Sequence, residues 1–251
     1  MIDIAASLRR RFSRPKVIAG GQAAGLKLVA HGAHPDFAAG VYELPVQAAI
    51  ADSLGAGDCF FDVGANIGFF SLVAARCVGD AGMVYAFEPV RANAARIART
   101  AELNGLDGRL RVFEEAVGAA TGRAELLLAR HIGGAALSTA DAPPDMAARA
   151  EVEIVTLDDA VVRHGLRPPR LVKIDVEGAE IDVLRGMTGV IRSHRPAIIY
   201  EVDDATREGL ERKAEEIRSF LLDAGYGLEL LPPAYDMTEW HVEHVLARPV
   251  S

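Results

Sequence analysis

The sequence has few cysteines, since its 251 residues include only Cys59 and Cys77. The two form no CxxC motif and no cluster with histidine. Structural zinc sites use closely spaced cysteines and histidines, so this pattern argues against one. We predict that both cysteines are reduced thiols in the core, which is usual for a cytoplasmic protein.

Long apolar runs are also missing. No segment approaches the roughly 20 apolar residues of a membrane-spanning helix. The N-terminal segment MIDIAASLRRRFSRP has no long apolar stretch after its basic cluster. We therefore expect neither a transmembrane segment nor a signal peptide. We interpret this segment as a surface-docked leader, the alternative being a helix that contacts an anionic membrane or an upstream partner.

An excess of positive charge is lacking too. The chain has 27 Lys and Arg against 35 Asp and Glu, which gives a net charge of −8 at pH 7. Because proteins that bind nucleic acid carry basic surfaces, we expect no nucleic-acid partner. Hydrophobic residues make up half of the chain, which is enough for a substantial core.

Short apolar strands and helices alternate along most of the chain. This pattern predicts an α/β fold with a doubly wound, mostly parallel sheet. Strands are predicted at 59–63, 83–89, 109–118, 171–176 and 196–202, and helices at 67–78, 91–103, 179–187 and 206–223. We expect the tail from 226 to 249 to add one or two strands, including an antiparallel C-terminal strand.

Two regions depart from this alternation. RAELLLA (123–129) and EVEIVTL (151–157) predict strands on either side of a segment rich in Gly, Ala and Pro. We interpret the region from about 119 to 157 as a β-hairpin insertion with a mobile loop. Residues 1–50 are expected to form a leader and a small cover over the ligand-binding edge of the sheet, and residues 51–251 the main domain.

The first predicted strand leads into the motif DVGANIG, residues 62–68. In doubly wound sheets, ligands bind beyond the carboxyl ends of the strands. Gly64 permits a sharp turn, and Gly68 permits close packing of the next helix, whose N-terminus attracts a carboxylate or phosphate. Asp62 can accept a hydrogen bond from an ammonium group, and Asn66 can hold the loop or contact the ligand. The motif therefore predicts a site for a nucleotide-like ligand.

The glycine spacing of this motif differs from that of two common nucleotide-binding loops. The dinucleotide fingerprint G-x-G-x-x-G does not match, because the order here is Gly64-x-Asn66-x-Gly68. The sequence also has no G-x-x-x-x-G-K-[ST] motif, which excludes a P-loop. An NAD-dependent oxidoreductase is therefore disfavoured.

Glu88 ends the second predicted strand, roughly 20 residues after the glycine loop, where an acid can accept hydrogen bonds from both hydroxyls of a ribose. The alternative is a solvated strand-end glutamate. After the third strand, we expect Glu115 to accept a hydrogen bond from an adenine amine and Ala116 to offer its backbone N–H. The alternation of side chains leaves open whether Glu114 or Glu115 faces the ligand.

A second motif, KIDVEGAE, spans residues 173–180. Asp175 and Glu177 alternate along a strand and its exit, so they share one side at the carboxyl edge of the sheet. Glu201 lies at the tip of the next strand. Carboxylates there can stabilise a bound cation, and one of them can accept the proton of an attacking hydroxyl. We therefore take Asp175, Glu177 and Glu201 as the candidate catalytic residues.

Other polar residues are given lesser roles. We expect Lys173 to be a partly buried lysine paired with an acid, and stabilisation of a helix N-terminus is the alternative role for Glu177 and Glu180. Tyr42 and Glu43 are weighed as residues that close over the cofactor, and His131 is a weak candidate for the base. The acids Asp175, Glu177 and Glu201 also suit Mg²⁺. No second acidic cluster supports a metal, so we predict no metal ligands and keep Mg²⁺ as a minor alternative.

Together these motifs resemble class I S-adenosylmethionine-dependent methyltransferases and, more narrowly, the FkbM family. The resemblance spans about residues 40–205 and is carried by DVGANIGFFSL (62–72), VYAFEP (84–89), ALSTA (136–140) and above all VKIDVEGAEIDVLRG (172–186). It implies a Rossmann-like domain that binds S-adenosyl-L-methionine and releases S-adenosyl-L-homocysteine. The resemblance implies that the methionine part of the cofactor is contacted by Asp62, Gly64, Asn66 and Gly68, and its ribose by Glu88. Asp175 is also counted among the cofactor-binding residues.

The resemblance also implies methyl transfer, usually to a hydroxyl and often on a sugar or a polyketide-like natural product. We therefore expect an O-methyltransferase with a small-molecule acceptor. One alternative is a protein or nucleic-acid methyltransferase, which is disfavoured because IDVE stands where such enzymes carry N-P-P-Y or D-P-P-Y. Another is a non-catalytic scaffold that binds S-adenosylmethionine. Residues 1–40 and 225–251 match no pattern and are expected to shape the acceptor pocket. The oligomeric state is open, with a homodimer as one option.

Overall fold

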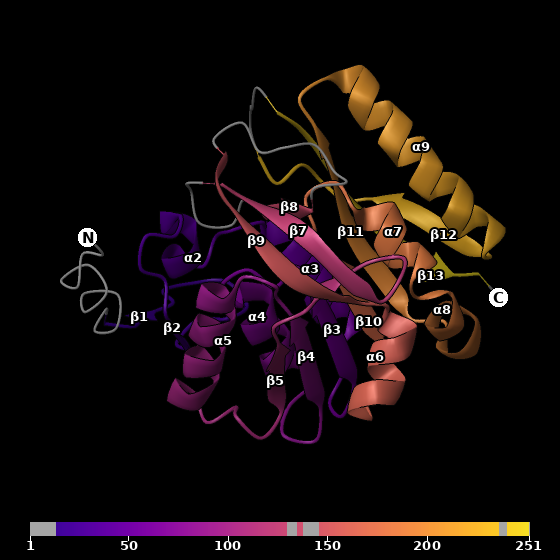
Figure 1. Cartoon of the computed structure of the whole chain (residues 1–251). Helices are drawn as coiled ribbons and strands as arrows, with labels where there is room; N and C mark the ends of the chain where they lie inside the picture. Colours follow the sequence, from indigo (N-terminus) through magenta and orange to yellow (C-terminus); the bar gives the residue numbers. More distant parts are fainter. Residues whose placement is uncertain (1–13, 130–134, 138–145, 236–239, 251) are drawn as a thin grey trace.

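The computed structural model describes residues 14–129, 135–137, 146–235 and 240–250. Its centre is a seven-stranded sheet with the order β12-β13-β11-β10-β3-β4-β5 (Figure 1). The strands are β3 (Cys59–Val63), β4 (Met83–Phe87), β5 (Leu110–Phe113), β10 (Leu171–Ile174), β11 (Ala197–Asp204), β12 (Tyr226–Leu230) and β13 (His241–Pro249). Neighbours are parallel except where β13 pairs with β11 and β12. This confirms the predicted doubly wound sheet with an antiparallel C-terminal strand.

Helices cover both faces of this sheet (Figure 1). One face carries α3 (Leu44–Ser53), α4 (Phe69–Cys77) and α5 (Arg91–Leu103), and the other carries α6 (Leu157–His164), α7 (Glu180–Arg185), α8 (Thr188–His194) and α9 (Arg207–Asp223). Successive residues of β3 serve the two cores, since Phe60 belongs to the first and Phe61 to the second. Among the described helices, none combines the length and the apolar character needed to cross a bilayer.

Most predicted elements are present, and the differences have physical reasons. The helix expected at 67–78 begins at Phe69, because its N-cap Gly68 has a left-handed conformation with φ 84°. The sequence pattern predicts no element where α6 and α8 lie. These helices have only 8 and 7 residues, which is too short for a clear apolar period.

The insertion is a four-stranded sheet rather than a simple hairpin. Its order is β6-β9-β7-β8, formed by β6 (Ala116–Val117), β9 (Met146–Val155), β7 (Gly122–Ala129) and β8 (Ala135–Leu137). The antiparallel pair of β7 and β9 is the predicted hairpin. Leu126 of β7 packs against Ala179 and Val176 in the loop after β10. The loop predicted to be mobile falls largely outside the described residues, as does His131.

The N-terminal segment packs beside the loop that follows β3. It holds β1 (Lys16–Val17), β2 (Lys27–Leu28), α2 (Pro35–Ala39) and α3. The rings of Phe37 and Tyr42 lie 5.5 and 6.2 Å from that of Phe69 at the start of α4. The segment therefore lies where a cover is expected. The predicted leader, residues 1–13, lies outside the described residues, and the division of the chain at residue 50 stays a prediction.

Candidate functional site

The carboxyl ends of β3 and β10 meet at the point where the strand order reverses. From there, the sheet continues through β4 and β5 on one side and through β11 on the other. Ligands of doubly wound sheets bind at this switch point. The loop after β3 carries DVGANIG, and the loop after β10 carries DVEGAE. The fold thus brings both predicted motifs to one edge, which we call the candidate cofactor site.

The loop after β3 is a tight turn. Gly64, Asn66 and Gly68 have φ angles of 78°, 52° and 84°, in the left-handed region that favours Gly and Asn. A Cβ on Gly64 would lie 1.7 Å from the carbonyl oxygen of Asp175, and a Cβ on Gly68 would lie 3.0 Å from the side chain of Ile97 in α5. Both glycines are therefore required by close packing as well as by the turn.

Two buried oxygens at this loop have no hydrogen-bond partner among the described residues, namely Asp62 Oδ1 and Asn66 Oδ1. The other carboxylate oxygen of Asp62 accepts a hydrogen bond of 2.5 Å from the Ser71 hydroxyl. Burial raises the pKa of Asp62, and the charge of Lys173 opposes this rise. An unsatisfied buried acceptor costs about 1–3 kcal/mol. The two oxygens are therefore suited to a ligand that supplies donors, such as an ammonium group.

Glu88 follows β4 and links two loops of the site. It is 4% exposed, and its oxygens accept hydrogen bonds from the N–H groups of Asn66, at 2.8 Å, and Val90, at 2.9 Å. Burial raises the pKa of Glu88 to about 7, although these N–H groups act in the opposite direction. Its carboxyl group lies at the strand end where a ribose contact is predicted.

Glu115 is the more buried of the two adjacent acids, and it faces α6. Its oxygens lie 3.2 Å from Arg163 and 2.9 Å from His164, both in α6. The Glu115 side chain is 15% exposed, whereas that of Glu114 is 55% exposed. Ala116 is buried at the start of β6. Contacts of Glu115 and Ala116 with an adenine stay predictions, and Glu115 also ties β5 to α6.

Lys173 is the buried, paired lysine that the sequence predicts. Its Nζ lies 2.7 Å from Asp175 Oδ2 and 4.6 Å from the centre of the Phe70 ring. Burial by itself lowers the pKa of Lys173, but the charges of Asp175, Glu43 and Asp62 raise it well above its usual range. Lys173 is therefore a fixed cation and does not act as a proton acceptor.

The loop after β10 carries two further acids with different surroundings. Glu180 is buried and accepts hydrogen bonds from the N–H groups of Gly178, at 3.0 Å, and Val176, at 3.3 Å. Burial raises its pKa to about 7, and its role here is to hold the loop. Glu177 has an exposed side chain and a φ of 56°. Although this side chain reaches solvent, crowding by the surrounding chain partly desolvates its carboxyl group, and this desolvation and the charge of Asp175 raise the pKa of Glu177.

Glu201 belongs to a cluster with Glu43 and His244. His244 in β13 lies directly opposite Glu201 in β11, and its Nε2 is 2.7 Å from Glu201 Oε2 and 3.2 Å from Glu43 Oε2. The side chains of His244, Glu43 and Glu201 are 3%, 0% and 17% exposed. Sequence reasoning missed His244, because only the register of the antiparallel strand places it beside Glu201.

The charges in the Glu43–Glu201–His244 cluster depend on one another. Burial by itself lowers the pKa of His244, but Glu201 and Glu43 raise it to about 10. For Glu43, burial is outweighed by His244 and Lys173, which lower its pKa to about 2. Burial and the charge of Asp175 raise the pKa of Glu201 to about 8. These directions favour a protonated His244 beside an ionised Glu43.

Tyr235 joins the C-terminal region to the N-terminal cover. Its hydroxyl donates a hydrogen bond of 2.6 Å to Glu43 Oε1 and lies 3.4 Å from the hydroxyl of Tyr42. The packing of Tyr42 against Phe69 and Phe70 of α4 brings this group of residues to the loop after β3. Closure of Tyr42 and Glu43 over a cofactor stays a prediction.

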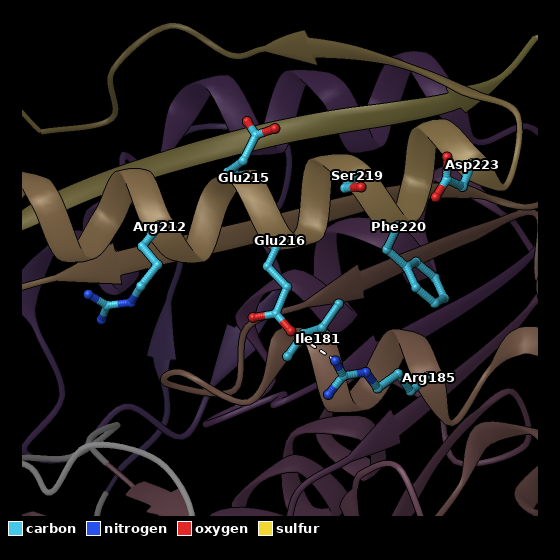
Figure 2. Close-up of a pocket in the computed structure, with 8 residues that line it drawn as sticks. All are labelled: Ile181, Arg185, Arg212, Glu215, Glu216, Ser219, Phe220 and Asp223. Carbon is cyan, nitrogen blue, oxygen red and sulfur yellow. Dashed lines mark hydrogen bonds and ion pairs between the residues drawn. The ribbon is translucent and has the colours of Figure 1, made fainter.

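A separate surface pocket of about 560 Å³ lies between α7 and α9 (Figure 2). Figure 2 shows Glu216 of α9 reaching towards Arg185 of α7, and these two side chains pair at 2.8 Å. The lining also includes Ile181 and Phe220, which are partly buried and pack against the core. Because the groove holds neither of the two motifs, we do not count it as part of the candidate cofactor site.

Comparison with known proteins agrees with this geometry. Residues 62–228 match the model of the methyltransferase FkbM domain. A curated relative, 31-O-demethyl-FK506 methyltransferase FkbM of Streptomyces tacrolimicus, is 31% identical over 173 residues. The matched region covers 59% of this chain and 66% of the relative, so just under two thirds of the relative's length is matched.

Solved structures show the same fold. A methyltransferase FkbM from Methylobacillus flagellatus superimposes with a TM-score of 0.54 at 18% identity, covering 76% of this chain and 43% of that one. An O-methyltransferase from Bacillus cereus, solved in complex with SAH, gives a TM-score of 0.51 at 15% identity and covers 82% and 79% of the two chains. At these identities the likeness establishes the Rossmann-like class I methyltransferase fold.

Proposed function

The chain belongs to the FkbM methyltransferase family, and from this membership we propose that it is an S-adenosylmethionine-dependent O-methyltransferase whose acceptor is a hydroxyl on a sugar or natural-product small molecule. The proposed cofactor site is the switch point between β3 and β10. The O-methylation part is supported by the name of the curated relative, which is a 31-O-demethyl-FK506 methyltransferase.

The observation that carries the cofactor assignment is the pair of buried oxygens, Asp62 Oδ1 and Asn66 Oδ1, that have no hydrogen-bond partner in the described part of the chain. The ammonium group of a methionine moiety supplies the donors that these acceptors lack. The first turn of α4, which follows Gly68, offers free N–H groups to a carboxylate. We assign the ribose hydroxyls to Glu88 and the adenine to Glu115 and Ala116.

When bound, S-adenosylmethionine supplies the methyl group on a positively charged sulfur. Asp175, Glu177 and Glu201 lie near enough to one another for their charges to interact, and we assign them to this end of the site. The charge of Asp175, and of either glutamate when it is ionised, stabilises a sulfonium more than a neutral thioether. The raised pKa values of Glu177 and Glu201 make them better proton acceptors, once ionised, than an ordinary carboxylate.

The residues of the chain then have three tasks in the transfer. The loop after β3 holds the cofactor in one orientation, which can contribute several kcal/mol through alignment alone. One of the carboxylates of Asp175, Glu177 and Glu201 would orient the acceptor hydroxyl and would take its proton during methyl transfer, in which the bond between sulfur and the methyl group is exchanged for one between oxygen and the methyl group. Lys173 stays protonated and limits the repulsion among the acids around it.

Calorimetric titration of the full chain with S-adenosylmethionine and S-adenosylhomocysteine tests this proposal. We expect micromolar binding of both, weakened at least about tenfold, or ~1.4 kcal/mol, by Glu88→Ala. The matched control is Glu102→Ala, because Glu102 is an exposed acid on α5 that pairs only at the surface with Arg99. Absence of binding to a folded wild-type sample would exclude the cofactor assignment. Binding without methyl transfer to any tested hydroxylated sugar or natural product would favour a non-catalytic scaffold.

A further inference from the structure

The Glu43–Glu201–His244 cluster has the composition and spacing of a metal site. One ligand atom from each residue can be chosen so that all three lie within 4.8 Å of one another. They comprise one imidazole nitrogen and two carboxylate oxygens. This mixed set suits divalent transition-metal ions such as Mn²⁺ or Zn²⁺ better than Mg²⁺, which prefers oxygen ligands. We propose that Glu43, Glu201 and His244 bind a divalent transition-metal ion.

Two of the three proposed ligand atoms are buried without a hydrogen-bond partner in the described part of the chain. These atoms are Glu43 Oε2 and His244 Nε2, of which the second is also within ion-pair distance of Glu201 Oε2, at 2.7 Å. They lie 3.2 Å apart, but the contact does not have hydrogen-bond geometry. Ligand atoms about 2.1 Å from a common ion are separated by roughly 3.0–3.4 Å. The spacing of Glu43 and His244 is therefore close to that of two atoms around an ion, whereas the 2.7 Å between His244 Nε2 and Glu201 Oε2 must widen when an ion replaces the proton between them.

The surroundings of Glu43 support this assignment. Tyr235 donates its hydrogen bond to Glu43 Oε1, which leaves Oε2 directed at His244. Such outer hydrogen bonds orient metal ligands in proteins. Glu43 also has a left-handed backbone with φ 44°, a conformation that costs of order 1–3 kcal/mol and gathers at functional sites. The strained backbone conformation therefore lies at a residue whose carboxylate belongs to the proposed metal site.

The three ligands come from parts of the chain that differ from the predicted acidic set. The acids weighed for Mg²⁺ are Asp175, Glu177 and Glu201, and Glu201 is the one residue that the two sets share. Three protein ligands leave a coordination position open for water or a substrate. In this position, and resting on the proposed function, the ion would bind the acceptor hydroxyl and make its proton more acidic. A proton on His244 and the ion compete for the same nitrogen.

The test is a titration of the EDTA-treated full chain with Mn²⁺. The electron paramagnetic resonance signal of free Mn²⁺ measures how much is bound, and Zn²⁺ is added as a competitor. We expect one equivalent bound per chain. His244→Gln and Glu43→Gln should each weaken binding by at least about tenfold, and Tyr235→Phe by about tenfold. Glu243→Gln is the matched control, because Glu243 precedes His244 in β13 and so points to the other side of the sheet.

The outcomes are distinct. If the wild-type chain binds neither Mn²⁺ nor Zn²⁺ stoichiometrically, the cluster is only an ion pair and the metal site is ruled out. Equal weakening by Glu243→Gln and His244→Gln overturns it as well. Should His244→Gln fail to fold, as judged by circular dichroism, Glu43→Gln and Tyr235→Phe decide. Calorimetry with S-adenosylhomocysteine on the same samples separates the two proposals, because cofactor binding without metal binding refutes only the metal site.

Discussion

Gly64 and Asp175 are in backbone contact. A Cβ at position 64 would lie only 1.7 Å from the carbonyl oxygen of Asp175. The contact joins the loop after β3, which carries the proposed cofactor contacts, to the loop after β10, which carries the proposed catalytic acids. A shift of either loop therefore moves the other. The proposed cofactor contacts and the proposed catalytic acids thus keep their relative position.

This contact predicts the effect of Gly64→Ala. The added methyl group must displace the loop after β10, and alanine also disfavours the φ of 78°. We expect a loss of about 3 kcal/mol in the free energy of unfolding, measured with urea, together with much weaker binding of S-adenosylhomocysteine. Gly105→Ala is the control, since Gly105 has a similar φ of 65° but no atom within 4 Å of its Cβ position. Equal losses in the two variants would show that backbone strain, not contact with Asp175, is responsible.

The raised pKa of Glu88 predicts how cofactor affinity depends on pH. The ribose hydroxyls donate to the ionised carboxylate, whereas Glu88 has a pKa of about 7 in the ligand-free chain. Affinity for S-adenosylhomocysteine should therefore rise about tenfold between pH 6 and pH 8. The neutral sulfur of this ligand minimises effects of the other acids. Glu88→Gln should bind weakly at both pH values, and a wild-type affinity that does not change would contradict the assignment.

The same group contributes to the pH dependence of stability. Glu88 holds its proton up to a pKa of about 7 when folded, whereas its usual pKa is near 4.5. Between these values the folded chain binds more protons, so this contribution to stability falls as pH rises. Urea unfolding of the ligand-free chain at pH 5 and pH 7.5 should show a smaller decrease for Glu88→Gln than for the wild type. A decrease of the same size in both would assign the slope to other acids.

The pairing of Lys173 with Asp175 predicts a stability effect. Lys173→Met leaves a carboxylate without its partner, beside the buried Asp62. Breaking a buried pair in this way costs about 3–5 kcal/mol, and we expect about 3 because the Asp175 side chain is 22% exposed. Arg185→Met, which breaks the exposed pair with Glu216, should cost less than about 1 kcal/mol in the same urea measurement. A comparable small loss for Lys173→Met would show that Asp175 is well solvated.

The acids of the site should discriminate between cofactor and product. Asp175→Asn removes a negative charge that favours the sulfonium, so it should weaken S-adenosylmethionine more than S-adenosylhomocysteine. We expect the ratio of the two dissociation constants to change by about fivefold, which corresponds to ~1 kcal/mol. Asp182→Asn, on the exposed side of α7, should leave the ratio unchanged. If Asp175→Asn weakens the binding of both ligands equally, the role of Asp175 is to hold the loop and not to stabilise the charge of the sulfonium.

The predictable parts of this protein were those that depend on local pattern. The apolar run at 59–63, the glycine loop and the acids at strand ends follow from residue type and spacing, and the fold confirms their common edge. His244 could not be found in this way, because its place depends on the register between β11 and β13. Glu115 was ambiguous for a similar reason, since packing on α6 decides which of two adjacent acids faces inward.

The Glu43–Glu201–His244 cluster also has a consequence for the order in which the proposed metal site is synthesised. Of its three members, Glu43 is synthesised first, Glu201 next and His244, in the last strand of the sheet, after both. The glycine loop, Glu88 and the acids after β10 are all present before β13 emerges. The residues of the proposed cofactor site are therefore all synthesised before the last member of the cluster. Because β13 inserts between β11 and β12, the step that closes the sheet also delivers the last member of the cluster.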